Sequence, residues 1–265
     1  MMEWLAYYLA LGAFVGFFAG MLGIGGGGVM VPLLVWLLEA QGMPHDTVLH
    51  LAVGTSMATI LFTSASSVRA HAARGAVRWD IAKAMTPGIL IGGLAGSAIA
   101  NVIPTVLFAA LFTATVYAAS ANMLIDRKPR PSRTVPGPLG ASIAGFVISA
   151  VSAFAAIGGA FMTVPYMLYC NVPMMHAIGT AAVVGFPIAL AGTVGFIAGG
   201  WGSAALPAWS LGYVYLPALL GITVASVLFA PLGAMVAHRL PTKVLKRIFA
   251  VLLFGFATRM LVGML

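Results

Sequence analysis

The sequence predicts an all-α integral membrane protein built from two inverted-topology repeats of about five membrane segments each. Three observations lead to this prediction: an apolar composition, an internal repeat, and opposite charge in matching loops. Of the 265 residues, 62% are hydrophobic and 7% are charged, whereas roughly 25% are charged in an ordinary soluble domain. Because so few polar groups could not cover a surface in water, the lipid bilayer is the expected solvent.

Apolar stretches separated by turn residues predict ten helices, and most reach the roughly 20 residues needed to cross hydrocarbon. They run over about 4–22, 25–40, 47–70, 80–101, 104–125, 138–155, 158–172, 175–198, 208–237 and 241–264. The stretches 25–40 and 158–172 are short, and each follows a glycine-rich break. The pairs 4–40 and 138–172 are therefore either two full spans or one re-entrant hairpin.

Short motifs recur in the same order in both halves of the chain. Ile24–Pro32 resembles Ile157–Pro165, and Ala52–Thr55 resembles Ala177–Thr180. Near the ends of the halves, Gly96 with Pro104-Thr105 matches Gly233 with Pro241-Thr242. Matches along both halves indicate internal structural symmetry. We divide the chain into a first transmembrane repeat over 1–125, a linker over 126–137 and a second repeat over 138–265.

Basic residues gather in three clusters, which the positive-inside rule places in the cytoplasm. They are Arg69, Arg74, Arg78 and Lys83; Arg127, Lys128, Arg130 and Arg133; and Arg239, Lys243, Lys246 and Arg247. The loop at 69–83 is basic and its mate at 194–208 is uncharged, whereas the turn at 101–104 is uncharged and its mate at 238–247 is basic. This opposite bias predicts inverted halves, a cytoplasmic linker and both termini outside. The clusters are interpreted as topological signals, not as substrate ligands.

The run Gly23–Gly28, interrupted only by Ile24, is the sharpest local feature. Contiguous glycine breaks a helix and frees backbone N–H groups, which membrane depth tolerates only where protein or a wet cavity surrounds them. The next helix begins near Val29, so its positive end lies at the break and favours an anion. Gly158-Gly159 would supply a second helix N-terminus, and the two broken hairpins would meet near the midplane. The alternative is close helix packing through small residues.

Hydroxyl groups near these breaks could donate hydrogen bonds to an anion, although a hydroxyl bonded back to its own helix is the alternative. The predicted substrate-binding residues are Gly23, Ile24, Gly25, Gly26, Gly27, Gly28, Thr55, Ser56, Gly158, Gly159, Thr163 and Thr180. The second copy has Ala160, Phe161 and Ala181 where the first has Gly27, Gly28 and Ser56. We therefore expect an asymmetric site with most ligands from the first copy.

The sequence argues against an enzyme and against a bound metal or cofactor. All five acidic residues lie in loops or at predicted helix ends, so no carboxylate relay crosses the membrane. The single Cys170 excludes a multi-thiolate metal site, and no catalytic motif such as H-E-x-x-H or G-x-S-x-G occurs. The expected partners are a small anion and the lipid bilayer, not nucleic acid, and a homodimer is one option for assembly.

The stretch Gly16–Gly27, followed by Pro32 and by Gly54-Thr55-Ser56, resembles the sulfite exporter TauE/SafE family over essentially the whole chain. The resemblance implies transport of sulfite, of sulfonates such as sulfoacetate, or of related oxyanions across a bacterial inner membrane. The inverted halves separately predict alternating access around the midplane site, by movement of one bundle against the other. Two alternatives stay open at this point: a transporter of another small organic anion, and a membrane scaffold that transports nothing.

Overall fold

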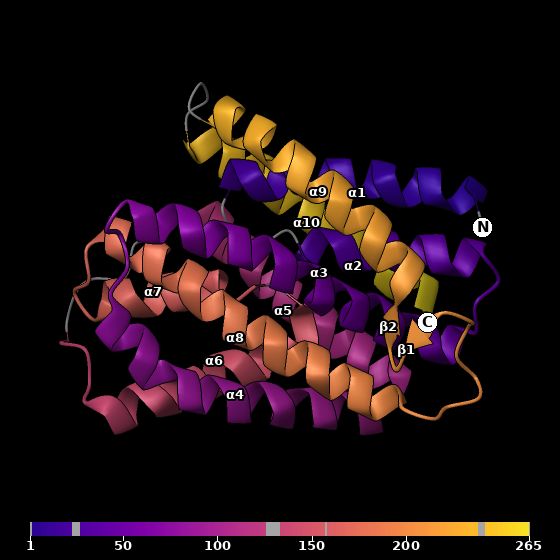
Figure 1. Cartoon of the computed structure of the whole chain (residues 1–265), viewed down its shortest axis with the longest axis horizontal. Helices are drawn as coiled ribbons and strands as arrows, with labels where there is room; N and C mark the ends of the chain where they lie inside the picture. The colour runs from indigo at the N-terminus through magenta and orange to yellow at the C-terminus, as the bar shows by residue number, and fades with distance from the viewer. Residues whose placement is uncertain (1, 23–26, 126–132, 157, 238–241, 265) are drawn as a thin grey trace.

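A computed structural model describes residues 2–22, 27–125, 133–156, 158–237 and 242–264. Within these ranges the chain forms ten α-helices and one small hairpin (Figure 1). The first-half helices are α1 (Met2–Leu22), α2 (Gly27–Ala40), α3 (His45–Ala73), α4 (Trp79–Val102) and α5 (Thr105–Ile125). The second half holds α6 (Pro138–Ala155), α7 (Ala160–Tyr169), α8 (Met174–Gly200), α9 (Leu216–Ala237) and α10 (Thr242–Met264). The predicted helices are thus confirmed, with one shifted start.

The helix predicted over 208–237 is the one that starts later than expected. It is observed as α9, which begins only at Leu216. Strands β1 (Ser210–Leu211) and β2 (Val214–Tyr215) pair as an antiparallel hairpin instead. Trp209 and Gly212 have positive φ angles of 68° and 55°, a conformation that interrupts a helix. The turn at Gly212 therefore overrides the apolar character of this stretch.

Six helices in the described part of the chain are long and apolar enough to cross a membrane, namely α3, α4, α5, α6, α8 and the first part of α9. In contrast, α7 has only 10 residues, which rise about 15 Å. That is about half the roughly 30 Å thickness of the hydrocarbon core. The pair α6–α7 thus combines one helix of spanning length with one that is too short to span.

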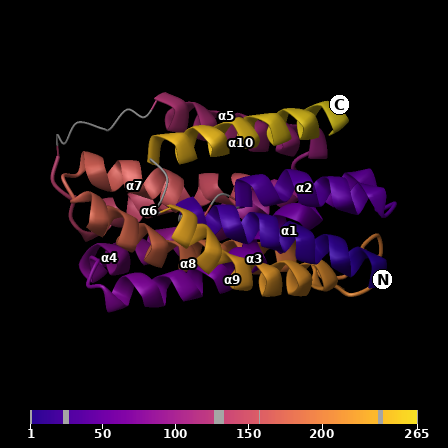
Figure 2. The same ribbon diagram turned by 90° about the horizontal axis from the view of Figure 1, so that it is seen from above.

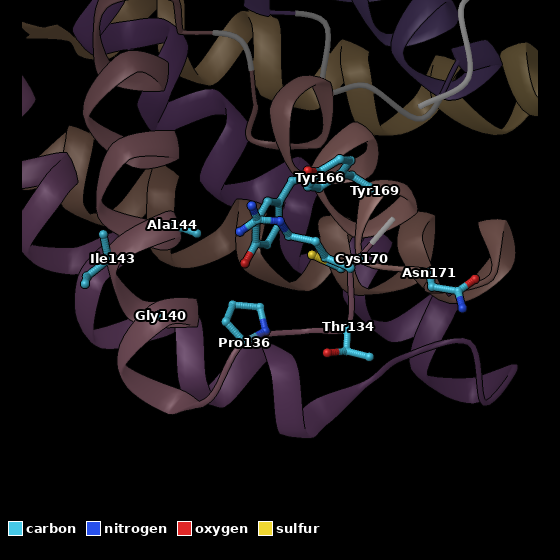
Figure 3. Close-up of a pocket in the computed structure, with 10 residues that line it drawn as sticks. Thr134, Pro136, Gly140, Ile143, Ala144, Tyr166, Tyr169, Cys170 and Asn171 are labelled. Carbon is cyan, nitrogen blue, oxygen red and sulfur yellow. The ribbon is translucent and has the colours of Figure 1, made fainter. Parts of the chain in front are cut away.

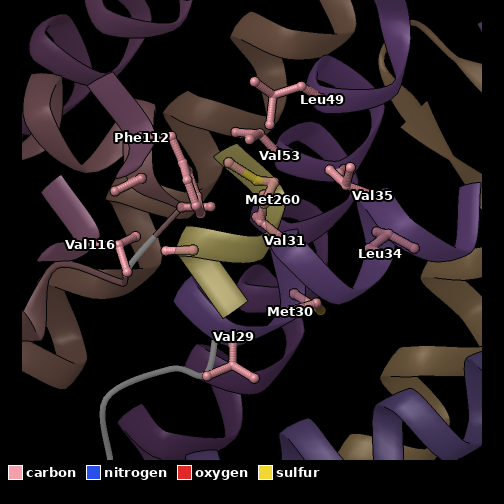
Figure 4. Close-up of a cluster of buried hydrophobic side chains, with 14 of the residues drawn as sticks. Val29, Met30, Val31, Leu34, Val35, Leu49, Val53, Phe112, Val116 and Met260 are labelled. Carbon is pink, nitrogen blue, oxygen red and sulfur yellow. The ribbon is translucent and has the colours of Figure 1, made fainter. Parts of the chain in front are cut away.

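The helices pack in reciprocal pairs. The most extensive contacts join α1 to α9 and α4 to α6, and α3 packs against α8 between these pairs. Figure 1 shows α1 and α9 along one edge of the bundle and α4 along the opposite edge. Figure 2 shows α5 beside α10, and it places both ends of the chain at the same end of the bundle. The largest hydrophobic cluster joins α2, α3, α5 and α10, with Met30, Val53, Phe112 and Met260 among its members (Figure 4).

Glycines set the close approach of both edge pairs. Side chains at Gly12 and Gly16 of α1 would collide with Ile222 and Ser226 of α9. In the same way, side chains at three α4 glycines would collide with the α6 backbone, Gly88 with Ser142, Gly92 with Phe146 and Gly96 with Ala150. These glycines recur every four residues on one helix face, which is the small-residue pattern of closely packed membrane helices.

Gly92→Leu is expected to destabilise the protein strongly. A Cβ at this position would overlap the Phe146 carbonyl oxygen, and overpacking of a rigid contact costs about 1–3 kcal/mol or more. Thermal unfolding in detergent measures the effect. Gly255→Leu is the matched control, because no described atom lies within 4 Å of a Cβ built there. Equal melting temperatures for the two variants would contradict the packing assigned to α4 and α6.

Candidate functional site

The two short helices begin at matching points of the two halves. Gly27 starts α2 and Ala160 starts α7, and these positions have the same spacing as Ile24 and Ile157. Each helix contains a proline five residues after its start, Pro32 and Pro165. Gly27 is buried, and Ala160 is half-buried and follows the buried Gly158 and Gly159. The structure thus gives two inward-lying helix N-termini, which are the positive ends of the helix dipoles.

The start of α2 touches the end of α6. A side chain at Gly27 would collide with the Ala156 carbonyl oxygen, and its Cβ would lie 2.8 Å from Cδ1 of Ile60 on the neighbouring α3. Ala156 has a φ of 45°, a left-handed conformation that ends α6 and turns the chain toward α7. Glycine at position 27 is therefore required for the contact between the two hairpins.

Several donors converge at the start of α7. The N–H of Thr163 donates to the Gly159 carbonyl at 2.8 Å, whereas the N–H groups of Ala160 and Met162 have no acceptor among the described residues. The Thr163 side chain is fully buried, and its hydroxyl has no hydrogen-bond partner in the described part of the chain. This oxygen lies 3.5 Å from the position of a Cβ at Gly159. Free N–H groups with a buried hydroxyl beside them suit an oxyanion.

A second buried hydroxyl belongs to Ser56 on α3. It is 0% exposed, and its oxygen also has no partner within the described ranges. Ser56 lies one helical turn from Ile60, so both occupy the face of α3 that covers Gly27. Since burying a hydroxyl without a partner costs roughly 1–3 kcal/mol, Ser56 and Thr163 are positions where a bound ligand would supply the missing bond.

The two halves differ beside the helix starts. Ile60 fills the space against Gly27, whereas the residue at the matching position of α8 is Gly185. Gly185 is buried, and no described atom lies within 4 Å of a Cβ built there. The same face of α8 carries Ile188, whose Cδ1 covers Gly159. Among the described residues, Gly185 therefore has open space at the position where the first half has an isoleucine side chain.

Thr55 and Thr180 instead hold the loops before two long helices. The Thr55 hydroxyl accepts a hydrogen bond from the N–H of Tyr215, just before α9, at 2.9 Å. The Thr180 hydroxyl accepts one from the N–H of Arg78, just before α4, also at 2.9 Å. The preceding residues, Gly54 and Gly179, lie against the carbonyl oxygens of Tyr213 and Ala76. Each copy of the Gly-Thr motif thus holds a loop of the other half, and the two loops occupy corresponding positions, before α9 and before α4.

Replacing either threonine with valine is expected to lower the free energy of unfolding by about 1–3 kcal/mol. Valine keeps the shape but leaves a backbone N–H without its acceptor. This N–H is the buried one of Tyr215 in Thr55→Val and the partly buried one of Arg78 in Thr180→Val, so the larger loss is expected for Thr55→Val. Thr55→Ser and Thr180→Ser retain the acceptor and should unfold close to the wild type in detergent. Equal stability of the valine and serine variants would contradict the anchoring role.

The predicted site residues fall into three groups in the structure. Gly23, Ile24, Gly25 and Gly26 lie outside the described residues. Gly27 and Gly28, at the start of α2, and Gly158, Gly159 and Thr163, at the start of α7, belong to the two adjoining hairpins. Thr55 and Thr180 contact loops at opposite ends of the bundle (Figure 1), and a role for them in binding the anion stays a prediction. Sequence reasoning missed Ile60, Ala156, Gly185 and Ile188, although the repeat spacing marks Ile60 and Gly185 as a pair.

No group of three or more potential metal ligands occurs among the described residues. The candidate site contains backbone N–H groups, hydroxyls and apolar side chains. These groups can bind and release an anion through hydrogen bonds and helix dipoles, and they supply no nucleophile beside a general base.

Known proteins resemble this chain over most of its length. The family model described as "Sulfite exporter TauE/SafE" matches residues 8–260. A "Probable membrane transporter protein" of Haemophilus influenzae is 37% identical over 95% of this chain and 96% of its own length. Proteins with similar descriptions from Bacillus subtilis and Methanocaldococcus jannaschii are 26% and 23% identical over 88% and 90% of this chain, and over 90% and 88% of their own lengths. No solved structure matches the chain.

Proposed function

The chain belongs to the sulfite exporter TauE/SafE family of multi-pass membrane proteins, and from this premise we propose that it moves a small sulfur-containing oxyanion such as sulfite or an organic sulfonate. The observation that carries the proposal is the contact between Gly27 and Ala156, since it brings the α2 and α6–α7 hairpins together. The anion would lie between the two helix starts.

The chemistry of this region favours an anion over a cation or a neutral solute. Its groups are helix N-termini, the N–H groups of Ala160 and Met162, and the hydroxyls of Thr163 and Ser56, none of which has a partner among the described residues. All of them donate hydrogen bonds, and helix dipoles add positive potential. A sulfite or sulfonate group offers several acceptor oxygens to such a set of donors.

We further propose that the two halves are inverted repeats and that their relative movement gives alternating access. The reciprocal pairs α1·α9 and α4·α6 support this proposal, as do the matching loop anchors at Thr55 and Thr180. An inverted pair of halves can exchange conformations, which exposes the same central site first to one side and then to the other. We place the protein in the bacterial inner membrane with the central linker in the cytoplasm.

Flux into and out of proteoliposomes tests the function. Labelled sulfite and sulfoacetate should cross with the purified protein, and an inside-negative potential should favour their exit by about 2.3 kcal/mol per charge per 100 mV. A panel of carboxylates of similar size distinguishes a transporter of other organic anions. No flux of any of these anions in vesicles that contain folded protein would contradict the proposal.

A further inference from the structure

A large cavity opens at the far end of α7, away from the central site. Its volume is about 900 Å³, and its walls come from α6, from the end of α7 and from the segment that precedes α6. Figure 3 shows Tyr166 and Cys170 on one side, Ile143 and Ala144 of α6 on the other, and Thr134 and Pro136 along the connecting segment. The predicted inside linker leads into this segment, so the cavity lies on the predicted cytoplasmic side.

The charge of this cavity is positive. Arg133 lines it, and no Asp or Glu is among its described lining residues. The backbone N–H of Arg133 donates to the Tyr169 carbonyl at 3.3 Å, which fixes the arginine beside the end of α7. The Tyr166 hydroxyl is buried and has no oxygen or nitrogen partner in the described part of the chain. Its hydrogen-bonding neighbour is the Cys170 thiol, which is a weak partner. A guanidinium and a phenol hydroxyl that is paired with a thiol together form a donor pair for an oxyanion.

The cavity also lies on the same face of the α7 segment as the central site. Gly159, Thr163, Tyr166 and Cys170 are spaced by four, three and four residues, which places them along one side of a helix. Thr163 and Tyr166 are separated by one turn, about 5 Å along the axis. An anion at Tyr166 would thus need to advance only about one or two turns to reach the N–H groups at the start of α7.

We propose that this cavity is the cytoplasmic vestibule for the transported oxyanion and that Arg133 captures the anion there. The inference rests on the proposed transport function and adds a second binding position to it. The volume greatly exceeds that of one sulfite ion, so the vestibule serves as a capture site open to organic sulfonates. Arg133, interpreted from the sequence as a topological signal, has this second role because of its place in the cavity.

Cys170 provides a built-in reporter, since it is the only cysteine in the chain and lines the cavity. Iodoacetate and iodoacetamide alkylate a thiol irreversibly and differ by one negative charge. Burial raises the pKa of the Cys170 thiol, so the reaction is run at mildly alkaline pH. Arg133 should favour the anionic reagent, and sulfoacetate should slow the alkylation by occupying the vestibule.

The test compares wild type, Arg133→Gln and the control Arg74→Gln in neutral lipid. Arg74 is exposed outside the cavity, in the loop before α4. The iodoacetate-to-iodoacetamide rate ratio should fall about fivefold in Arg133→Gln, the effect of one charge pair at close range in a water-like dielectric, and should not change in Arg74→Gln. Sulfoacetate should protect Cys170 in the wild type and in Arg74→Gln only.

Three outcomes would contradict the assignment of this cavity as a vestibule. The iodoacetate-to-iodoacetamide rate ratio could be equal in wild type and Arg133→Gln, sulfoacetate could fail to protect Cys170, or anionic phosphatidylglycerol could protect Cys170 where sulfoacetate does not. The last result would assign the cavity to a lipid headgroup. Flux in the same vesicles separates this inference from the proposed function. If sulfoacetate crosses the membrane but does not protect Cys170, the vestibule assignment alone is contradicted. If sulfoacetate protects Cys170 but no anion crosses, the capture site is supported and the transport function is contradicted.

Discussion

Gly27→Ala is expected to lower anion flux about a hundredfold. Even one methyl group at this position would overlap the Ala156 carbonyl and press on Cδ1 of Ile60. The start of α2 would then move away from the second hairpin. Displacement of binding groups by about 1 Å can cost a hundredfold in rate, and in the proposed site the two helix starts bind the same anion. The initial rate of sulfoacetate uptake into proteoliposomes measures the change.

Gly255→Ala is the matched control, because it adds the same methyl group to α10 where no described atom lies within 4 Å of the Cβ. This variant should transport like the wild type. Size-exclusion profiles and melting curves in detergent confirm that both variants are folded before flux is compared. Unchanged flux in folded Gly27→Ala would show that the contact between the hairpins is irrelevant to transport.

Thr163→Val is expected to reduce apparent anion affinity by about ten- to a hundredfold while leaving the protein at least as stable as the wild type. The lost hydrogen bond to a charged ligand corresponds to roughly 1.5–3 kcal/mol. Stability should not fall, because the buried Thr163 hydroxyl has no partner among the described residues. Replacing it with a methyl group of similar shape removes an unsatisfied polar group. The concentration dependence of flux and the melting temperature are measured together.

Thr113→Val separates a role in binding from a general effect of removing a hydroxyl. Thr113 lies on α5, is 2% exposed and also has a hydroxyl without a partner in the described ranges. This variant should match Thr163→Val in stability and the wild type in flux. A loss of stability in Thr163→Val, or equal affinity for the anion in both variants, would contradict a donor role for Thr163.

Much of the fold follows from local patterns in the sequence. The predicted helix over 80–101 is observed as Trp79–Val102, and 104–125 as Thr105–Ile125, because long apolar runs bounded by turn residues have few alternatives in lipid. The stretch 208–215 escaped this reasoning, since two positive φ angles turn an apolar segment into a hairpin. Gly212, between two apolar residues, is the signal that could have indicated the turn.

The candidate site could be predicted only where local chemistry defines it. Contiguous glycines and the start of a short helix are visible in the sequence, and they identified the regions of Gly27 and Gly159. The roles of Thr55 and Thr180 were not visible, because their partners Tyr215 and Arg78 lie far away in the chain. The cavity at Arg133 likewise depends on how α6 and α7 pack, which no local pattern encodes.

The most direct test of the proposed anion site is whether an aqueous anion reaches the buried position of Gly185, on the face of α8 that covers the start of α7. Gly185→Cys in a Cys170→Ala background places a thiol where no described atom lies within 4 Å of the Cβ. The account predicts that iodoacetate alkylates this thiol in proteoliposomes and that sulfoacetate slows the reaction. A folded variant whose thiol stays unreactive from both sides, with or without sulfoacetate, would contradict a central anion site.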